Sequence, residues 1–146
     1  MSSSEERESL VVIGVPHDKF YVYNLATDTW RVRKVEFRSG VFLETYSTCF
    51  ARNDWIYYVG GGLSSQVCRL ELEHFEFDEL TRLNTPRTEH CSVLLDDGVL
   101  IMGGCVKKEG LILKSCEMYF PQRNQLSQVA DMNVSKCGFS AVSHKG

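Results

Sequence analysis

Two glycine pairs, Gly60-Gly61 and Gly103-Gly104, lie 43 residues apart, and an apolar segment precedes each of them. The segments read WIYYVGG and VLIMGG, and each follows an Asn-Asp or Asp-Asp-Gly turn of the kind found in tight hairpins. A glycine pair after a strand can hold a phosphate, but neither pair leads into a helix or a Gly-Lys-Ser/Thr ending. Their recurrence in register therefore predicts a structural repeat.

The segments around the glycine pairs recur as well. STCFA (47–51) aligns with CSVLL (91–95) before the turns, and a second pair of apolar segments follows each glycine pair. Tyr23 to Trp30 and Tyr119 to Leu126 share a spacing of seven residues, and Leu80 takes the place of Trp30 in the middle copy. The alternation of polar and apolar residues predicts half-buried strands. Four short strands, lettered A to D, with a period of 43 to 50 residues predict an all-β fold of β-propeller blades.

These motifs resemble the kelch family. YNLATDTW (23–30), IYYVGG (56–61) and LIMGG (100–104) match its blade pattern, and TPRTEH (85–90) resembles its linker between blades. The chain departs from the pattern where the first copy has one glycine and where Leu80 and Leu126 replace Trp. The resemblance implies structural roles for Gly14, Gly60, Gly61, Gly103, Gly104, Tyr23, Trp30 and Tyr119.

The repeat sets the expected organisation of the chain. Residues 1–9 are polar and acidic, and we expect a disordered tail. Residues 10–46 hold strands B, C and D of a partial blade, 47–90 and 91–137 each hold a complete blade, and 138–146 hold strand A of a next blade, at Phe139 to Ser143. The prediction is an incomplete kelch-type propeller of about three blades, each of four antiparallel strands.

About three blades are too few for a closed ring, since propellers have four to eight. An open arc would leave sheet edges and apolar strand faces in water. Two explanations fit. The chain is a fragment of a longer kelch protein, or it forms a homodimer in which the terminal strand A of each copy completes the opening blade of the other in a six-bladed ring.

Composition narrows the class of function. A net charge of −3 offers no basic surface for nucleic acid, and no apolar run reaches the roughly 18 residues of a membrane span. The N-terminus, MSSSEERES, lacks the apolar segment of a secretory signal. The six cysteines are therefore expected to be thiols in a cytoplasmic, or nuclear, protein.

The cysteines and histidines form no recognisable metal or catalytic motif. The chain has no Cys-x-x-Cys pair, and Cys49 with Cys91, and Cys68 with Cys116, recur with the repeat, which predicts core thiols. Cys105, after the second glycine pair, is a candidate for redox sensing. No metal, cofactor or catalytic residue is expected. The scattered histidines are His17, His74, His90 and His144, of which His90 is expected to hydrogen-bond backbone between blades.

The resemblance implies that loops on one rim of the propeller bind a peptide or protein partner. These loops are the B–C connections 15–19, 62–66 and 105–110 and the connections between blades, 34–46, 82–89 and 131–138. Basic and hydroxyl side chains there suit an acidic or phosphorylated segment. For Arg87 the alternative is a brace between neighbouring blades. The expected partner-binding residues are Arg38, Tyr46, Ser64, Ser65, Gln66, Arg87, Lys107 and Lys108.

The function implied by the resemblance is a non-enzymatic interaction module. It would be the substrate-recognition propeller of a ubiquitin-ligase adaptor of the BTB or F-box kelch type, or a cytoskeletal, actin-associated scaffold. An alternative class is an enzyme on a kelch propeller, of the sugar-oxidase or sugar-epimerase type, which needs a Tyr/His/Cys copper site or an acid–base pair in the central channel. A third possibility is a truncated product that does not fold alone, since an open arc buries little apolar area.

Overall fold

The computed structural model describes residues 9–13, 19–35 and 48–144, and it divides into two units, residues 1–40 and 41–146. The described residues form strands joined by turns and loops, and all strand pairs are antiparallel. Helices are absent from these ranges, so none of them holds a helix that is long and apolar enough to cross a membrane. The prediction of an all-β fold is confirmed.

The first unit contains one three-stranded meander in the order β1-β2-β3. Its strands are β1 (Ser9–Ile13), β2 (Lys19–Asn24) and β3 (Thr29–Lys34). Asparagine and aspartate shape the turn between β2 and β3. Thr27 N donates a hydrogen bond to Asn24 Oδ1 at 3.1 Å, and Asp28 adopts a positive φ of 53°. Tyr23 pairs with Trp30 across this hairpin, with ring centroids 4.9 Å apart.

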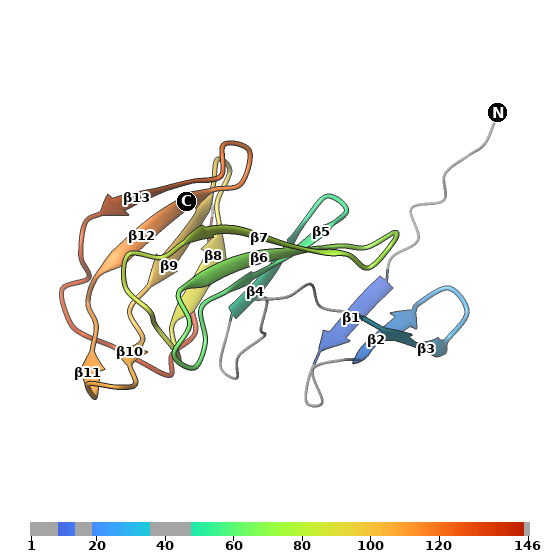
Figure 1. Ribbon diagram of the computed structural model, residues 1–146, viewed down its shortest axis with the longest axis horizontal. Coiled ribbons are helices and arrows are strands. Elements are labelled where there is room, and N and C mark those ends of the chain that lie inside the picture. The colour runs from blue at the N-terminus through green and yellow to red at the C-terminus, as the bar shows by residue number, and fades with distance from the viewer. Residues whose placement is uncertain (1–8, 14–18, 36–47, 145–146) are drawn as a thin grey trace. The chain divides into compact units, whose positions relative to one another are not determined.

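The second unit contains two four-stranded antiparallel sheets (Figure 1). The first sheet, in the order β4-β5-β6-β7, consists of β4 (Thr48–Arg52), β5 (Trp55–Val59), β6 (Gln66–Glu71) and β7 (Phe77–Arg82). The second sheet, in the order β8-β9-β12-β13, consists of β8 (Cys91–Leu94), β9 (Val99–Met102), β12 (Cys116–Phe120) and β13 (Gln125–Val129). A short hairpin of β10 (Cys105–Val106) and β11 (Leu111–Ile112) interrupts it between β9 and β12.

The two sheets repeat each other in their backbone hydrogen bonds. Gly60 N donates to Gln66 O at 2.9 Å, and Gly103 N donates to Ser115 O at 3.1 Å. The second glycine of each pair donates to a linker carbonyl, which is Arg87 O for Gly61 and Lys136 O for Gly104. Residues before the B–C connection correspond with an offset of 43, and residues after it with an offset of 49. The B–C connection of the second sheet is therefore longer by six residues, and it contains the β10–β11 hairpin.

The glycine pairs permit a close backbone approach. Gly60 and Gly103 have φ values of 58° and 57°, in the left-handed region. A Cβ on Gly60 would lie 2.6 Å from Arg87 O, and one on Gly103 would lie 2.6 Å from Lys136 O. The linker carbonyl therefore occupies the space that a side chain would need at the first glycine of each pair.

The core of the second unit lies between its two sheets. Alternate residues of β5 and β6 face alternate residues of β9 and β12, as the period-two pattern predicts. Tyr57 and Tyr119 meet across this core with ring centroids 6.3 Å apart. At one end of the core, Thr48 Oγ1 lies 2.8 Å from His90 Nε2 and 2.6 Å from Ser92 Oγ, so β4 and β8 are linked side by side. The buried core residues are Tyr57, Val59, Val67, Leu83, Val99, Ile101 and Tyr119.

The alignment of the later strands differs from the prediction in register. Leu70 pairs with Phe77 and Tyr119 pairs with Leu126, so Phe77, and not Leu80, corresponds to Trp30. The spacing of seven residues holds in all three copies. The pairing of β6 with β7 shifts in register between Gln66 and Cys68. The alignment with Leu80 assumed a strict alternation of the two faces along β7, and this shift interrupts that alternation.

The cysteines are also one residue out of register between the sheets. Cys49 and Cys68 both pair with Tyr58 and share one face of the first sheet. Cys91 and Cys116 both pair with Met102, on the face of the second sheet that corresponds to the opposite face of the first. A shift of one residue reverses the face, so these cysteines are not equivalent positions of the repeat.

Residues 139–143, predicted as strand A of a next blade, form no strand among the described residues. A strand needs a neighbour to accept and donate its backbone hydrogen bonds, and the described part of the chain supplies none there. The segment before it nevertheless follows the repeat. Met132 N donates to Lys114 O at 2.8 Å as Leu83 N donates to Ser65 O at 2.7 Å.

Candidate functional site

The B–C connections of the two sheets meet around one shallow pocket. Gly62 and Leu63 line it from the connection between β5 and β6, and Lys107 and Lys108 line it from the β10–β11 hairpin. Its volume is about 380 Å³. We call residues 62–66 and 105–112 together the loop surface. The structure thus brings together two loops that the sequence predicts to share a rim.

Backbone geometry presents Leu63 to solvent. Gly60, Gly61 and Gly62 have φ values of 58°, 97° and 50°, a region that glycine adopts more readily than residues with a Cβ. The loop then closes tightly, because Ser64 N donates to Gly61 O at 2.7 Å and Gln66 N donates to Ser64 Oγ at 3.0 Å. As a result the side chain of Leu63 is 65% exposed at the tip of the loop.

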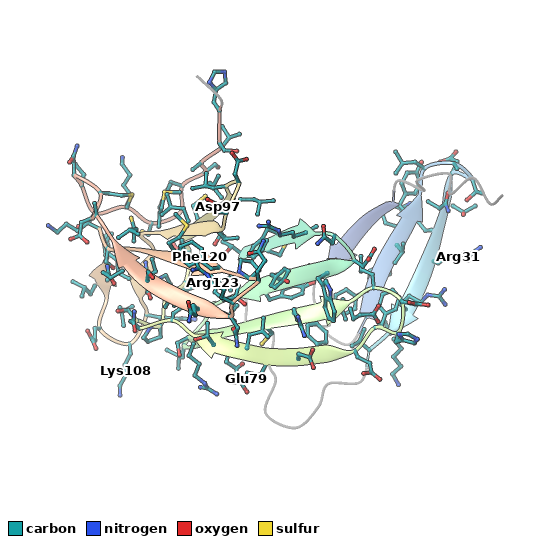
Figure 2. The ribbon with its side chains drawn as sticks, turned by 90° about the horizontal axis from the view of Figure 1, so that it is seen from above. Arg31, Glu79, Asp97, Lys108, Phe120 and Arg123 are labelled. Carbon is teal, nitrogen blue, oxygen red and sulfur yellow. The ribbon has the colours of Figure 1, made fainter. Side chains whose placement is uncertain are left out.

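The β10–β11 hairpin presents the two lysines. Val106 is buried, while the turn residues after it are exposed and Gly110 closes the turn with a φ of 65°. Thr88 and Cys105 exchange backbone hydrogen bonds of 3.0 and 2.8 Å, which tie the hairpin to the linker between the sheets. Figure 2 shows Lys108 extending away from the ribbon. Leu111 and Ile112 on β11 are exposed beside the lysines.

The loop surface combines positive charge with apolar area. Among the described residues, neither Lys107 nor Lys108 forms an ion pair, and Glu109 is the one acidic residue of the hairpin. Ammonium groups of this kind attract carboxylates and phosphates, and an exposed leucine favours contact with an apolar side chain. The arrangement suits binding, through charge and apolar contact together.

The other predicted partner-binding residues differ in their exposure. Ser64 and Ser65 are half-buried in the loop surface, and Gln66 is buried at the start of β6. Arg38 and Tyr46 lie outside the described residues, as does Gly14, for which a structural role was predicted. The prediction missed Leu63, Leu111 and Ile112. The signal for Leu63 and Leu111 is a large apolar residue directly after a glycine in a loop, and Ile112 follows Leu111.

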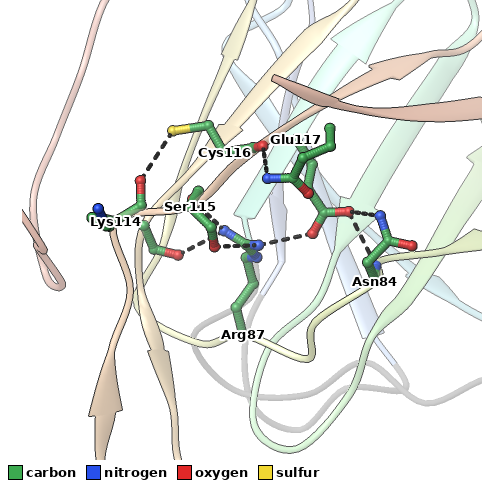
Figure 3. A network of polar contacts seen from close by, with 8 residues as sticks. Asn84, Arg87, Lys114, Ser115, Cys116 and Glu117 are labelled. Carbon is green, nitrogen blue, oxygen red and sulfur yellow. Dashed lines mark hydrogen bonds and ion pairs between the residues drawn. The ribbon is translucent and has the colours of Figure 1, made fainter. Parts of the chain in front are cut away.

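Arg87 lies in the interior, where its guanidinium cannot reach a partner. Its side chain is 1% exposed, and Nη1 donates to Gly103 O at 3.0 Å and to Ser115 O at 2.9 Å. Nη2 donates to Ser115 Oγ at 3.3 Å and to Glu117 Oε1 at 2.8 Å (Figure 3). The placement of Arg87 in the binding surface is thus wrong for this structure, and the alternative of a brace between neighbouring sheets describes its contacts.

Glu117 completes this network from the second sheet. Its carboxylate is fully buried on β12, and Oε2 accepts from Asn84 N at 3.1 Å and Asn84 Nδ2 at 2.9 Å (Figure 3). Both carboxylate oxygens therefore bind the linker that follows the first sheet. A single acidic residue inside the apolar strand CEMYF was the sequence signal for this partner, and the prediction did not use it.

The histidines occupy different environments. Burial, together with the charge of Arg87, lowers the pKa of His90 to about 4, so the ring is neutral near pH 7. His90 contacts the Thr48 hydroxyl of the first sheet through its ring, and it also hydrogen-bonds with the backbone of Arg87 and Val59, as expected for this residue. His144 is exposed, and His17 lies outside the described residues.

One set of side chains with metal-binding potential lies together among the described residues, at the turn after β6. It comprises Glu71, Glu73 and His74. Glu71 already accepts the backbone N–H groups of Glu73 and His74, at 3.0 and 2.7 Å, and His74 Nδ1 lies 3.0 Å from Glu71 Oε2. These contacts are those of a turn closed by its own carboxylate.

All six cysteines are free thiols. Burial raises the pKa of Cys68 to about 12, which keeps that thiol protonated. Burial, and then the neighbouring Glu89, also raises the pKa of Cys105, the candidate for redox sensing. A raised pKa lowers the fraction of reactive thiolate, so the environment of Cys105 does not favour that role.

Comparison with models of known protein families finds no match, and comparison with curated proteins finds none either.

Proposed function

We propose that this chain is a non-enzymatic interaction module, part of a kelch-like propeller, and that its loop surface binds an acidic peptide segment containing an apolar residue. The observation that carries the proposal is the pocket that Leu63 shares with Lys107 and Lys108. Each side of this pocket comes from a different copy of the repeat, so two sheets together create it.

The repeated sheets support the propeller part of this proposal. Two four-stranded meanders pack face to face, in sequence order, with equivalent glycine pairs and equivalent linker contacts. A propeller is built from such meanders, each covering the face of the one before. The resemblance of the motifs to kelch blades supplies the family, and with it a role as the recognition part of a cytoplasmic adaptor or scaffold.

Charge and geometry support an acidic ligand. The two lysines lie on a hairpin that is anchored by buried Val106 and by the Thr88–Cys105 backbone pair, so their positions are defined by rigid neighbours. An extended peptide places alternate side chains on opposite sides. Carboxylates on one side can reach the lysines while an apolar side chain contacts Leu63.

The test uses a fluorescein-labelled peptide of about twelve residues with alternating Glu and Leu, and its counterparts with Gln or Lys in place of Glu. Fluorescence anisotropy measures the dissociation constant for the whole chain. We expect the Glu peptide to bind most tightly, and Lys107→Glu with Lys108→Glu to weaken it about tenfold or more, because each exposed charge contact contributes up to about 1 kcal/mol.

Lys34→Glu is the matched control, since Lys34 is an exposed lysine of β3 in the first unit. It makes the same change in net charge as Lys107→Glu or Lys108→Glu alone, so each single variant is compared with it, and it does not touch the loop surface. Leu63→Ser should weaken the Glu peptide while leaving the dependence on salt unchanged. Equal binding of the Glu and Gln peptides, or equal effects of the Lys34 and Lys107/Lys108 variants, would contradict the proposal.

A further inference from the structure

The two sheets of the second unit differ in what covers one of their faces. In the first sheet this face carries Tyr57, Val59 and Val67, and the second sheet packs directly on it. By the register of the repeat, Leu100, Met102 and Cys116 are the corresponding residues of the second sheet. The question is what packs on these residues.

We call this set the apolar face of the second sheet. Two rows of directly paired residues form it, one from Val93 through Leu100 to Met118 and one from Cys91 through Met102 to Cys116. Leu100, Met102 and Met118 remain half-buried. These six residues are apolar or thiols, and β13 extends the two rows with Ser127 and Val129. A sheet face that meets water usually carries mostly polar residues.

The chain after β13 is already placed for a further sheet. A Cβ on Gly60 would approach Arg87 O, His90 and Leu83, and one on Gly103 would approach Lys136 O, Phe139 and Met132. Each member of the second set lies 49 residues after its counterpart in the first. Residues 140–143 therefore correspond to β8 after the first linker, and Val142, the counterpart of the buried Val93, is 87% exposed.

The sheet of the first unit offers the complementary face. Tyr23 and Trp30 form the pair that corresponds to Tyr119 and Leu126, which face the core between the two sheets. Tyr21 and Val32 are the next pair on the same side. Trp30 is 55% exposed and Val32 is 56% exposed. We call Tyr21, Tyr23, Trp30 and Val32 the aromatic face.

We propose that a second copy of this chain docks on the apolar face, covering it with the aromatic face of its β1-β2-β3 sheet. In the same contact, residues 140–143 pair with the edge of β1 in the second copy, and the two copies close as a dimer through two such contacts. The repeat itself supplies the argument for self-association, because one chain carries both halves of a contact that it already makes internally between its own two sheets.

Two physical features favour this occupant. Within the described residues β1 has a neighbour on one side only, so its other edge can accept a strand. Tyr21, Trp30 and Val32 are exposed beside each other, and they form the kind of contiguous patch that marks an interface. The apolar face and the loop surface share no residue, so this inference does not depend on peptide binding.

Sedimentation velocity on the full chain, at roughly micromolar to hundred-micromolar concentration, tests the inference. We expect a discrete dimer. Trp30→Glu should raise its dissociation constant by about a hundredfold or more, because a charge would be buried against apolar residues. Leu25→Glu is the matched control, since Leu25 is 51% exposed in the same unit, in the turn after β2, and should leave the dimer intact.

A mixing experiment tests the pairing of the two faces. Met118→Glu alters the apolar face, so Trp30→Glu and Met118→Glu should each be monomeric alone. Mixed in equal amounts, they can form one contact with both faces unaltered, and a weaker dimer should reappear. Circular dichroism verifies that each variant is folded.

Several results would overturn the inference: a monomer at all concentrations, an open-ended polymer, a dimer that Trp30→Glu leaves unchanged, or no recovery on mixing folded variants. Lys107→Glu with Lys108→Glu should leave the dimer unchanged, so the outcome for the dimer and the outcome for peptide binding can be told apart.

Discussion

The two linkers that follow β7 and β13 have the same backbone path and opposite side-chain environments. Leu83 and Met132 begin them with equivalent hydrogen bonds, and the carbonyls of Arg87 and Lys136 accept from the second glycine of each pair. The Arg87 side chain is buried against the second sheet, while the Lys136 side chain is exposed. The two linkers therefore share their backbone hydrogen bonds but differ in the exposure of the side chains at equivalent positions.

This difference separates two causes. The backbone path depends on the glycine pairs and forms whether or not a following sheet covers the linker. The burial of the linker side chain depends on the second sheet, which supplies Glu117 and the carbonyls around Arg87. Three sets of variants test these two causes, and the first set has the largest expected effect on the free energy of unfolding.

Arg87→Met should destabilise the chain by about 3–5 kcal/mol, because it leaves the Glu117 carboxylate buried without its cation. Urea unfolding at pH 7, followed by circular dichroism, measures the loss. Lys136→Met at the equivalent exposed position is the control, with an expected change within about 0.5 kcal/mol.

The same comparison has an internal check. Arg87→Met combined with Glu117→Gln removes both charges and keeps an oxygen for Asn84, so it should be more stable than Arg87→Met alone. Equal losses at Arg87 and Lys136 would mean that the buried network contributes little to stability.

His90 predicts a dependence on pH that Phe139, its counterpart in the second linker, lacks. The folded pKa of about 4 lies below the ordinary value of 6.5. Between these values the unfolded chain binds the proton more readily, so this contribution is complete above pH 6.5 and is lost as the pH falls toward 4. The loss amounts to about 1.4 kcal/mol per pH unit at most, or about 3 kcal/mol in all.

His90→Phe gives the first linker the phenylalanine that the second linker has at the equivalent position, and it removes the pH-dependent contribution of His90 to stability. The difference in unfolding free energy between the unaltered chain and this variant should narrow as the pH falls from 7 to 4. A constant difference over that range would show that His90 is not buried as a neutral ring.

Gly60→Ala should cost about 2 kcal/mol, because the Cβ would meet Arg87 O at 2.6 Å and the residue has a positive φ. Gly110→Ala separates the two causes. Gly110 has a φ of 65° with nothing within 4 Å of its Cβ position, so it should show the cost of conformation alone, about 1 kcal/mol. Thermal unfolding of both variants measures the difference. Similar losses would show that the linker moves aside at little cost.

Much of the fold follows from local pattern. Alternating residues and Asn/Asp/Gly turns predicted most of the strands, because strand pairing in a meander joins neighbours along the chain. The register in which the strands pair was harder to predict from the sequence. The pairing of β6 with β7 shifts in register between Gln66 and Cys68, and this shift places later residues of β7 on the opposite face of the sheet. The spacing of Leu80 in the sequence does not reveal the shift. Cys68 and Cys116 lie on non-equivalent faces of the two sheets for a similar reason: their positions in the repeat differ by one residue, and one residue reverses the face of a strand.

The candidate site was predictable in its position and less so in its residues. Connections of equivalent strands gather at one end of packed meanders, so the loops containing Ser64 and Lys107 were expected together. Whether a polar side chain in such a loop is exposed depends on its neighbours from the other sheet. Arg87 and Lys136 have equivalent positions, and only the second sheet distinguishes them.

By itself, the sequence of this chain determines an all-β fold with repeated glycine pairs, since strand periodicity and left-handed glycines are local properties of the backbone. Tertiary structure decided which side chains meet: Arg87 with Glu117, Thr48 with His90, and Leu63 with the two lysines. These contacts join residues far apart in the chain, and their geometry exists only once the sheets pack face to face.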